Sequence, residues 1–242
     1  MIKLVTVLKR RADMTRPEFE QRWLGIHAPI AAEFPDLRGY VLSFSIAEED
    51  LEADGVAQLW FDDRTGVQRS YASDIGRNGS ADASRYLARR EHLMVSERWL
   101  AGPRGVTAHP FKLLVGLKRP ETESRSDFVA RMAEVPVDPL LGTLQTGAVR
   151  LCIDEAGLQL NSGVSGSLEL FASEAVFDGM LEAWYRDADA LRHAASRFAN
   201  SPSHPTLVAG GRSEIIMLRE NVVVAPPDDI QPSELLSGMN AQ

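Results

Sequence analysis

Apolar residues follow strand-like patterns in four segments of the first hundred residues. Residues 2–9 form a nearly continuous apolar run, and residues 40–46 alternate between a strongly apolar face and a face of mostly smaller side chains. Residues 56–61 and 93–99 are two further apolar runs of strand length. The pattern predicts four strands in this part of the chain.

A helix-type pattern lies between the first two of these strands. Thr15 and Glu18 are spaced as a capping box, in which each side chain binds the other residue's backbone N–H at a helix start. The apolar positions that follow recur every three or four residues and therefore fall on one helix face. These positions are Phe19, Trp23, Ile26 and His27. Because Pro29 disfavours helical geometry at the residue before it, the helix over residues 15–27 is predicted to end or kink beside His27.

The remaining pattern of the first hundred residues gives the order strand, helix, strand, strand, helix, strand. Residues 63–73 are compatible with a helix, and residues 83–90 with a further short helical piece before the fourth strand. This order is that of the ferredoxin-like split βαβ unit. Such a unit carries both helices on one face of its sheet, so the other apolar face needs a partner layer.

The pattern of the first half recurs in the second. Residues 2–23 match residues 111–132 when one segment is moved by 109 positions. The matching pairs are Lys3 and Lys112, Leu4 and Leu113, Leu8 and Leu117, Lys9 and Lys118, Arg10 and Arg119, Arg16 and Arg125, Phe19 and Phe128, and Arg22 and Arg131. Further matches in the same order are Gly39 with Gly147, Phe61 with Phe171, residues 83–86 with 195–198, and residues 96–97 with 213–214. We interpret the chain as two tandem copies of one unit of roughly 105–110 residues.

The second copy is predicted to repeat the element order of the first. Its expected strands are residues 111–118, 148–153, 167–171 and 213–218, and its expected helices are residues 124–133 and 173–190. The predicted fold class is α+β, with two ferredoxin-like repeats whose sheets pack face to face as an α/β barrel within one chain. The predicted boundaries are residues 1–105 for the first repeat, 106–220 for the second and 221–242 for a C-terminal tail.

Composition places the chain among ordinary globular proteins and narrows its partners. Of its 242 residues, 44% are hydrophobic and 25% charged, and the formal net charge of -8 argues against nucleic acid or an anionic membrane surface as the main partner. Cys152 is the only cysteine, which excludes an internal disulfide and fits a cytoplasmic location. No apolar run reaches about 18 residues, and the basic residues near the N-terminus follow the apolar run, so neither a membrane span nor a signal peptide is expected.

His27 and Tyr40 are the leading candidates for chemistry. A histidine has an unperturbed pKa of about 6.5 and can act as a base and then as an acid near neutral pH. The alternative for His27 is a ring that only satisfies a backbone carbonyl at the helix end. Tyr40 opens a predicted strand and can donate a hydrogen bond to a substrate oxygen. The alternative for Tyr40 is a core aromatic side chain whose hydroxyl reaches the surface.

Four apolar side chains and a second histidine are candidates for contact with a substrate. The apolar candidates, which would form a pocket wall if they point inward, are Trp23, Leu42, Phe44 and Trp60. His92 precedes the fourth strand and could face the pocket mouth, although solvent exposure is the simpler expectation. No group of histidine, cysteine and acidic residues has the spacing of a metal site, so neither a metal nor another cofactor is expected.

Several motifs within residues 2–42 resemble the EthD family, which belongs to the dimeric α/β-barrel superfamily. They are the basic end of the first strand, the Thr-x-x-x-Phe-x-x-x-Trp pattern of the helix, His27-Ala28-Pro29, and the turn Pro35-Asp36-Leu37-Arg38-Gly39-Tyr40. The resemblance covers residues 1–100 and implies the barrel fold. In some members, such as methylmuconolactone isomerase, the helix histidine and the strand tyrosine line the pocket of a cofactor-free acid–base enzyme, which implies those roles for His27 and Tyr40.

The second copy departs from the family pattern at both positions. Pro136 stands where the alignment expects the histidine, and Ala148 where it expects the tyrosine. We therefore expect a single site in the first copy, with the second copy closing the barrel. Related barrel families include cofactor-free monooxygenases, polyketide cyclases and haem-binding peroxidases, so the fold does not fix the reaction.

Three functions remain open from the sequence. The leading hypothesis is a cofactor-independent acid–base enzyme, of the isomerase, lyase or dehydratase type, acting on a small, partly apolar catabolic or secondary metabolite through His27 and Tyr40. The second is a cofactor-free or haem-dependent monooxygenase on the same barrel. The third is a non-catalytic accessory protein that binds a small molecule. A homodimer of the whole chain is also left open.

Overall fold

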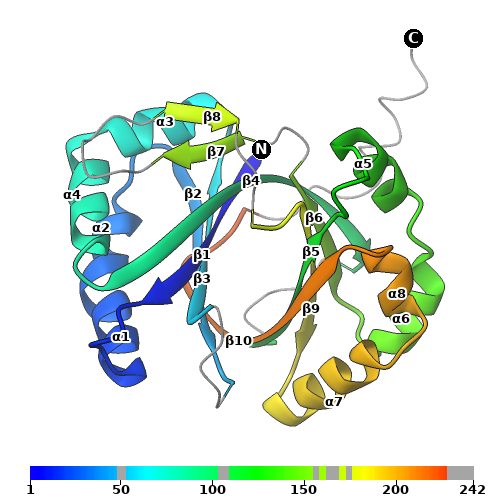
Figure 1. Ribbon diagram of the computed structural model, residues 1–242. Coiled ribbons are helices and arrows are strands. Elements are labelled where there is room, and N and C mark those ends of the chain that lie inside the picture. The colour runs from blue at the N-terminus through cyan, green and yellow to red at the C-terminus, as the bar shows by residue number, and fades with distance from the viewer. Residues whose placement is uncertain (48–52, 103–108, 155–157, 162–168, 173–175, 228–242) are drawn as a thin grey trace.

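The computed structural model describes residues 1–47, 53–102, 109–154, 158–161, 169–172 and 176–227. Eight strands form one closed barrel, and the helices pack against its outside in two groups, one on each side (Figure 1). Two further strands pair only with each other. None of the described helices is long and apolar enough to cross a membrane.

The first half supplies four barrel strands and one group of helices. Its elements are β1 (Ile2–Arg10), α1 (Arg16–Arg22), the π turn η1 (Trp23–His27), α2 (Ala28–Ala32), β2 (Leu37–Ser45), β3 (Gly55–Phe61), α3 (Arg64–Ala72), α4 (Asp74–Ala83) and β4 (Leu87–Ala101). The strand order across this half is β4-β1-β3-β2, and every pair is antiparallel.

The second half supplies the other four barrel strands and the second group of helices. Its elements are β5 (Phe111–Lys118), α5 (Arg125–Ala133), α6 (Val137–Leu144), β6 (Val149–Ile153), β7 (Leu158–Asn161), β8 (Glu169–Ala172), β9 (Gly179–Tyr185), α7 (Ala188–Ala199), α8 (Ser203–Val208) and β10 (Arg212–Val224). The strand order is β6-β9-β5-β10, again antiparallel, and β7 and β8 form the separate two-stranded sheet.

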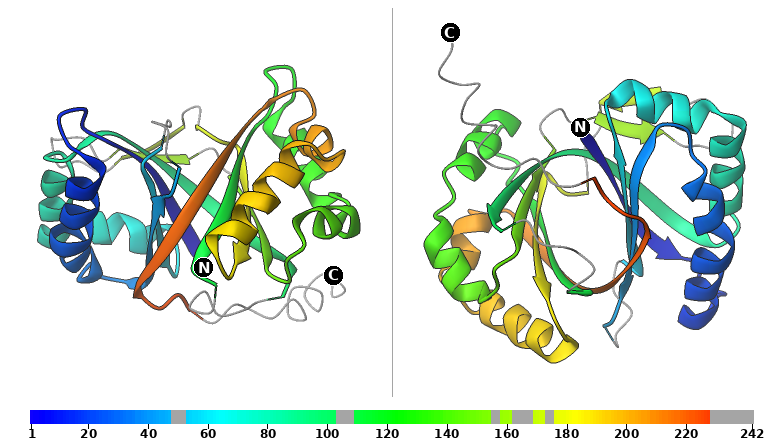
Figure 2. Two further views of the ribbon diagram at one scale, coloured as in Figure 1. Left: turned by 90° about the horizontal axis from the view of Figure 1, so that it is seen from below. Right: turned by 180° about the vertical axis from the view of Figure 1, so that it is seen from behind.

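The two half-sheets join along both edges and so close the barrel. β2 pairs with β10, where Ser45 lies opposite Leu218, and β4 pairs with β6, where Ser96 lies opposite Ile153. Figure 2 shows the ring of strands from two further directions, with the helices on opposite sides of it. The predicted α+β barrel within one chain is therefore confirmed.

Two predicted helical segments are wrong. Residues 83–90 end α4 and begin β4, because the helix before this segment already takes up residues 74–83, with Ser73 as its N-terminal cap. Residues 173–190 contain β9, and α7 begins only at Ala188. β9 is a strand because it lies between β5 and β6 and is buried along its whole length.

Strand pairing also corrects the alignment of the two halves. Tyr40 lies opposite Leu59 in the first half, and Val149 lies opposite Ala183 in the second. Leu59 also pairs with Leu4 of β1, and Ala183 also pairs with Leu113 of β5. Leu4 and Leu113 are 109 positions apart in the sequence, so these two places in the sheets correspond. The structural counterpart of Tyr40 is therefore Val149 and not Ala148, and neither carries a hydroxyl.

The predicted boundaries fit the structure only in part. β10 continues to Val224, which lies opposite Tyr40, so residues 221–224 belong to the barrel and not to a tail. The predicted division between residues 105 and 106 lies outside the described residues, as does the rest of the predicted tail from residue 228 onward.

The alternation of side chains along β1 shows how the sheet divides the core. Leu4 and Leu8 point outward into the apolar layer beneath α1 and α2, whereas Val5 and Val7 point into the barrel. The second half has its own apolar layer beneath its helices. The first of these outer layers, between sheet and helices, contains the candidate site.

Candidate functional site

The helix that carries His27 begins as predicted but does not end where predicted. The Thr15 side chain accepts a hydrogen bond from the Glu18 N–H, and Glu18 accepts one from the Thr15 N–H at 2.8 Å, which confirms the capping box. The chain then stays helical through α2, and the Ala28 N–H binds the carbonyl of Trp23, five residues earlier. Pro29 has no N–H to donate to the preceding helical turn. The chain accommodates this with a π turn, and the helix continues instead of ending at His27.

The π turn changes which side chains face the core. An i→i+5 turn holds one more residue than an α turn and so rotates the positions that follow. Trp23 is fully buried and His27 faces inward with 13% of its side chain exposed, but Ile26 is 48% exposed. The prediction that Ile26 shares the buried face is therefore wrong.

A small cavity of about 40 Å³ lies between the sheet of the first half and its helices. That volume holds about three water molecules. Its polar wall consists of Thr6, His27, Tyr40, Tyr71, Ser80, Tyr86, Arg90 and His92. Its apolar wall includes Leu8, Trp23, Phe34, Leu59 and Leu87. The cavity is thus rich in groups that can donate, accept or move a proton.

His27 is held at one ring nitrogen and available at the other. Nδ1 lies 3.2 Å from Oδ2 of Asp82, whose other oxygen accepts a hydrogen bond from Arg22. Nε2 makes no hydrogen bond to any residue in the described part of the chain. Burial lowers the pKa of His27 below its usual value, although the Asp82 carboxylate opposes the shift. His27 is therefore neutral at neutral pH, and the Asp82 carboxylate favours the tautomer with the proton on Nδ1.

Tyr40 and Trp23 lie together at the cavity. Both line the cavity, and the Trp23 side chain donates a hydrogen bond to the Tyr40 hydroxyl. Burial raises the pKa of Tyr40 well above its usual value, so this hydroxyl keeps its proton. Gly55 makes room for Trp23, because a Cβ at that position would lie 2.4 Å from the indole ring.

His92 lines the same cavity and is buried, which corrects the expectation of solvent exposure. Its Nδ1 lies 2.8 Å from the Thr6 hydroxyl. Burial, assisted by the positive charge of Arg90, lowers the pKa of His92 to about 3. His92 is thus a neutral ring that helps to shape the cavity wall.

The other three predicted contact residues do not line this cavity. Leu42 and Phe44 lie in the apolar layer between the sheet and the helices. Trp60 points into the barrel instead, where its ring N–H donates to Glu97 at 2.8 Å. Alternation along a strand separates its two faces but does not say which face meets the cavity.

A larger groove of about 590 Å³ lies on the outer side of the helices. It is bordered by apolar side chains that include Ile26, Ile30 and Ile75. Asp82 lines this groove, while its partner His27 lines the inner cavity. The His27–Asp82 pair therefore separates the inner cavity from the outer groove.

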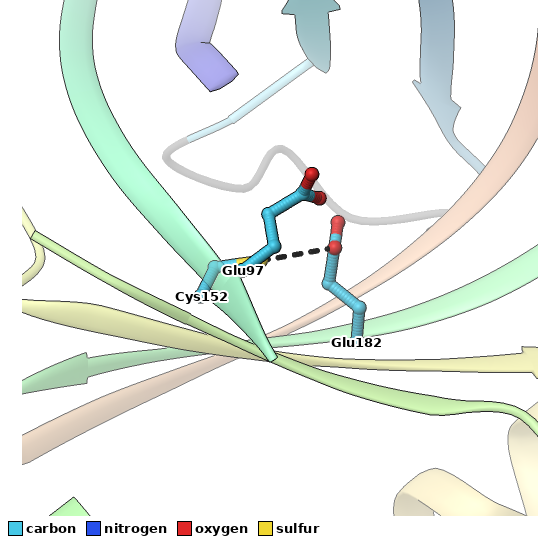
Figure 3. Close-up of side chains that lie close together, drawn as sticks. All are labelled: Glu97, Cys152 and Glu182. Carbon is cyan, nitrogen blue, oxygen red and sulfur yellow. Dashed lines mark hydrogen bonds between the residues drawn. The ribbon is translucent and has the colours of Figure 1, made fainter. Parts of the chain in front are cut away.

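The barrel interior holds a second polar cluster. Glu97, Cys152 and Glu182 point toward one another there (Figure 3), and they are the one group of three acidic, cysteine or histidine residues in the described chain that could hold a metal ion. Lys3 lies between them, with its Nζ 3.0 Å from Cys152 Sγ and 2.9 Å from a carboxylate oxygen of each glutamate. Burial and Arg150 lower the pKa of Lys3, but the neighbouring acidic groups Cys152, Glu182 and Glu97 raise it by more, so Lys3 stays charged and its ammonium takes the place a metal would need.

A haem group does not fit the cavity. A porphyrin is far larger than a space of about 40 Å³, and it would need an axial ligand such as a free histidine nitrogen at that space. His27 Nε2 could supply such a ligand, but its ring packs against Tyr86, and the space beside it is too small for the porphyrin.

Several residues of the cavity were missed by sequence reasoning. Asp82, Tyr71 and Arg90 lie in no motif, and the fold alone brings Asp82 to His27 and Tyr71 and Arg90 to the cavity wall. Tyr86 had a signal, since it closes a block that recurs in the second half, but the block was interpreted only as evidence of a repeat.

Comparisons with known proteins concern the first half of the chain and the fold. The EthD domain model matches residues 11–90. A solved structure of an ethyl tert-butyl ether D (EthD) family protein from Bacillus halodurans is 19% identical, covering 40% of this chain and 99% of its own, with a TM-score of 0.37. No curated protein shows a significant sequence match.

Two solved structures resemble the chain over almost its whole length. An anthrone oxidase-like protein is 8% identical, with 95% of this chain and 96% of that chain covered and a TM-score of 0.59. A protein proposed to be a monooxygenase, from Fusobacterium nucleatum, is 9% identical, with 95% of each chain covered and a TM-score of 0.52. At such low identity these likenesses establish the barrel fold and nothing finer.

Proposed function

We propose that the protein is a cofactor-independent enzyme that moves a proton on a small, partly apolar molecule, and the match of residues 11–90 to the EthD domain model supports this proposal. His27 is the base that removes the proton. Isomerisation and lyase-type elimination both follow from this step, because the same ring can return the proton at another atom.

The observation that carries the proposal is the state of the His27 ring. Asp82 holds the proton on Nδ1, which leaves the lone pair of Nε2 available. The lowered pKa keeps this nitrogen unprotonated at neutral pH. A neutral imidazole with one nitrogen fixed by a carboxylate is the arrangement that general-base catalysis requires.

Tyr40 supports the same reaction from the sheet side of the cavity. Its oxygen accepts the hydrogen bond of Trp23, so its own O–H proton can point elsewhere. We propose that Tyr40 donates to a polar group of the substrate and thereby orients it.

The substrate itself needs more room than the inner cavity provides. A space of about 40 Å³ admits only a small reacting group, whereas the outer groove of about 590 Å³ is in the usual range for small-molecule sites. We propose that the apolar body of the substrate lies in the groove beside Ile26 and Ile75 and that its reacting end meets His27.

The two halves are unequal in this proposal. They share one order of strands and helices, and we propose that they are diverged copies of one unit. Pro136 and Val149 stand in the second half where the first has His27 and Tyr40. We therefore place one active site in the first half and give the second half the role of closing the barrel.

Cofactor-free oxygenation is the second candidate, and the aromatic cavity wall favours it. Trp23, Tyr71 and Tyr86 suit the reacting edge of a flat aromatic substrate, which gives a stabilised anion after loss of a proton. Such an anion can react with molecular oxygen. The proton transfer to His27 is shared with the first candidate, so oxygen uptake during turnover is the measurement that separates them.

Deuterium exchange tests the proposal without knowledge of the substrate. Small enolisable ketones, unsaturated lactones and phenols are incubated with the protein in heavy water, and NMR follows the replacement of acidic hydrogens. We expect at least one compound to exchange faster with the protein, and His27→Gln to lose the acceleration. His193→Gln, an exposed histidine on α7, is the matched control and should keep it. Equal exchange with His27→Gln would contradict the proposal.

A further inference from the structure

Tyr86 carries a buried hydroxyl to which the described part of the chain offers no partner. Its side chain is 0% exposed and lines the cavity beside His27. No residue in the described ranges forms a hydrogen bond with this hydroxyl. Two of the other buried tyrosines are satisfied, since Tyr40 accepts from Trp23 and Tyr185 donates to the Leu144 carbonyl at 3.0 Å. Buried polar groups are nearly always paired, so an exception at a cavity needs an explanation.

The hydroxyl belongs to the same reaction space as the base. The ring of Tyr86 lies 5.5 Å from that of His27, at an interplanar angle of 63°. Burial, followed by the nearby Tyr40 and Asp82, raises the pKa of Tyr86 well above its usual value. The group therefore keeps its proton at neutral pH and acts as a donor.

A positive charge complements this donor. Arg90 lines the same cavity and carries a guanidinium that stays charged. The charge of Arg90 affects other groups of the cavity. It is the second cause of the low pKa of His92, behind burial, and it opposes the rise that burial causes in the pKa of Tyr71. A cavity with a buried O–H donor that can point at a ligand and a nearby cation stabilises negative charge on an oxygen.

We propose that Tyr86 donates a hydrogen bond to the substrate oxygen and that the substrate is a carbonyl compound that passes through an enolate. The inference rests on the proposed role of His27. Nε2 of His27 takes the proton from the carbon next to the carbonyl, and the electron pair of that C–H bond moves to form the carbon–carbon double bond. The π pair of the carbonyl bond moves onto its oxygen, which then carries the negative charge that Tyr86 and Arg90 stabilise. Where the substrate also has a carbon–carbon double bond next to the carbon that loses the proton, the enolate is conjugated. The proton can then return from His27 to the far carbon of the conjugated system, which completes an isomerisation with no oxidant or reductant.

Formate is a suitable probe of the oxygen site. It is an oxyanion of three non-hydrogen atoms, which matches a space for about three waters. Titration of ¹³C-formate by NMR measures its affinity for the wild-type protein and for Tyr86→Phe, and thermal unfolding of both proteins measures stability. We expect formate to bind the wild type and Tyr86→Phe to bind about ten to a hundred times more weakly, the factor of one hydrogen bond to a charged group.

Stability separates this role from a structural one. Because the Tyr86 hydroxyl has no protein partner to lose, Tyr86→Phe should unfold at the same temperature as the wild type or higher. Tyr185→Phe is the matched control, since it loses a real hydrogen bond and should unfold at a lower temperature with unchanged formate binding.

Three results would overturn the inference: no formate binding by the wild type, equal binding by Tyr86→Phe, or a loss of stability in Tyr86→Phe like that in Tyr185→Phe. Its failure is distinguishable from failure of the proposed function. If His27→Gln loses deuterium exchange while Tyr86→Phe binds formate normally, the base role stands and the oxygen site falls. If His27→Gln keeps exchange while Tyr86→Phe loses formate, the oxygen site stands without the base.

Discussion

At the scale of single residues, the site depends on the hydrogen bonds that the two carboxylate oxygens of Asp82 accept. One accepts from Arg22 and the other from His27 Nδ1. Arginine can only donate, so in an Asp82→Asn variant the amide oxygen would face Arg22 and the amide NH₂ would face His27. Nδ1 would then have to accept, and the ring proton would move to Nε2, where it blocks the base.

Asp82→Asn should therefore abolish catalysis by tautomer exchange while the fold is kept. We expect turnover to fall by about a hundredfold or more, the usual contribution of a general base. The ¹⁵N chemical shifts of His27 should show the proton on Nε2 in the variant and on Nδ1 in the wild type. Asp74→Asn, which changes an exposed acid on the same helix, is the control and should leave both unchanged. Full activity with the Nε2 tautomer would contradict the assignment of the base.

His92 makes a separate prediction about pH and stability. Its pKa is about 3 in the folded chain and close to 6.5 when unfolded. Between these values the unfolded chain binds more protons, so the free energy of unfolding falls as the pH drops from 6.5 toward 3. His92→Gln keeps a partner for Thr6 but cannot titrate. Relative to this variant, the wild type should lose up to about 1.4 kcal/mol per pH unit.

Chemical unfolding at pH 6.5, 5.5 and 4.5 checks the sign and size of this effect. His193→Gln, which removes an exposed histidine, should follow the wild-type curve. Parallel curves for the wild type and His92→Gln would show that His92 titrates normally in the folded protein.

Residues of the site differ in how far the sequence predicts them. His27, Trp23 and Tyr40 lie in one short motif, and the structure brings all three to the cavity. Asp82 is 55 residues away from His27, and only the packing of α4 against η1 places it there. Long-range packing of this kind leaves no periodic signal in a sequence, and neither does the π turn that exposes Ile26.

At the scale of elements, strands and helices form where periodicity and tertiary pairing agree. The β9 segment Gly-Met-Leu-Glu-Ala-Trp-Tyr was expected to be helical, since a short apolar run does not distinguish the two structures. Its counterpart β3, Gly-Val-Ala-Gln-Leu-Trp-Phe, has the same outline and was predicted correctly. In both strands the first glycine lies under an aromatic side chain of the helix layer, Trp23 over Gly55 and Phe128 over Gly179.

This contact predicts that Gly55→Ala disturbs both stability and the site. The new Cβ would lie 2.4 Å from the Trp23 ring, which would have to move and weaken its bond to Tyr40. We expect unfolding to become easier by about 1–3 kcal/mol, as for overpacking, together with lower activity. Gly142→Ala on α6 is the control, because its Cβ meets nothing within 4 Å and should stabilise the helix by about 0.5–1 kcal/mol. Similar effects of both substitutions would rule out the packing explanation.

At the scale of the whole molecule, the barrel is joined through a buried ionic network. Its charged members are the cations Lys3, Lys112 and Arg150 and the anions Glu97, Glu182 and Glu220. The positive and negative charges are equal in number, which is how buried charges are tolerated. Each half contributes a lysine, a glutamate and a tryptophan in the same arrangement: Trp60 donates to Glu97, and Trp184 donates to Glu220 at 2.9 Å. The similarity between the two halves therefore extends to the charged side chains inside the barrel.

The halves differ at one cross-strand pair of this network. Val41 lies opposite Gln58 in the first half, and Arg150 lies opposite Glu182 in the second. The second half has thus gained one cation and one anion together, and Arg150 Nη2 lies 2.8 Å from Glu182. The sequence predicts a repeat but not this pairing. Sequence matching aligns Tyr40 with Ala148, one residue away from its structural counterpart Val149, and only the strand register shows that Val41 and Gln58 correspond to Arg150 and Glu182.

The pair predicts strong coupling between two substitutions. Glu182→Gln alone leaves three buried cations with two anions, and Arg150→Met alone leaves three anions with two cations. Each should cost about 3–5 kcal/mol in the free energy of unfolding, as expected when one member of a buried pair is removed. Together they restore the charge balance and approach the apolar and amide character of Val41 and Gln58. The double variant should therefore be more stable than either single one, and a double-mutant cycle by chemical unfolding measures the difference.

The exposed pair Arg38 and Asp62 is the control: alanine at either or both should cost less than about 1 kcal/mol. Additive losses at Glu182 and Arg150 would show that the balance of charge within the barrel does not couple the two residues.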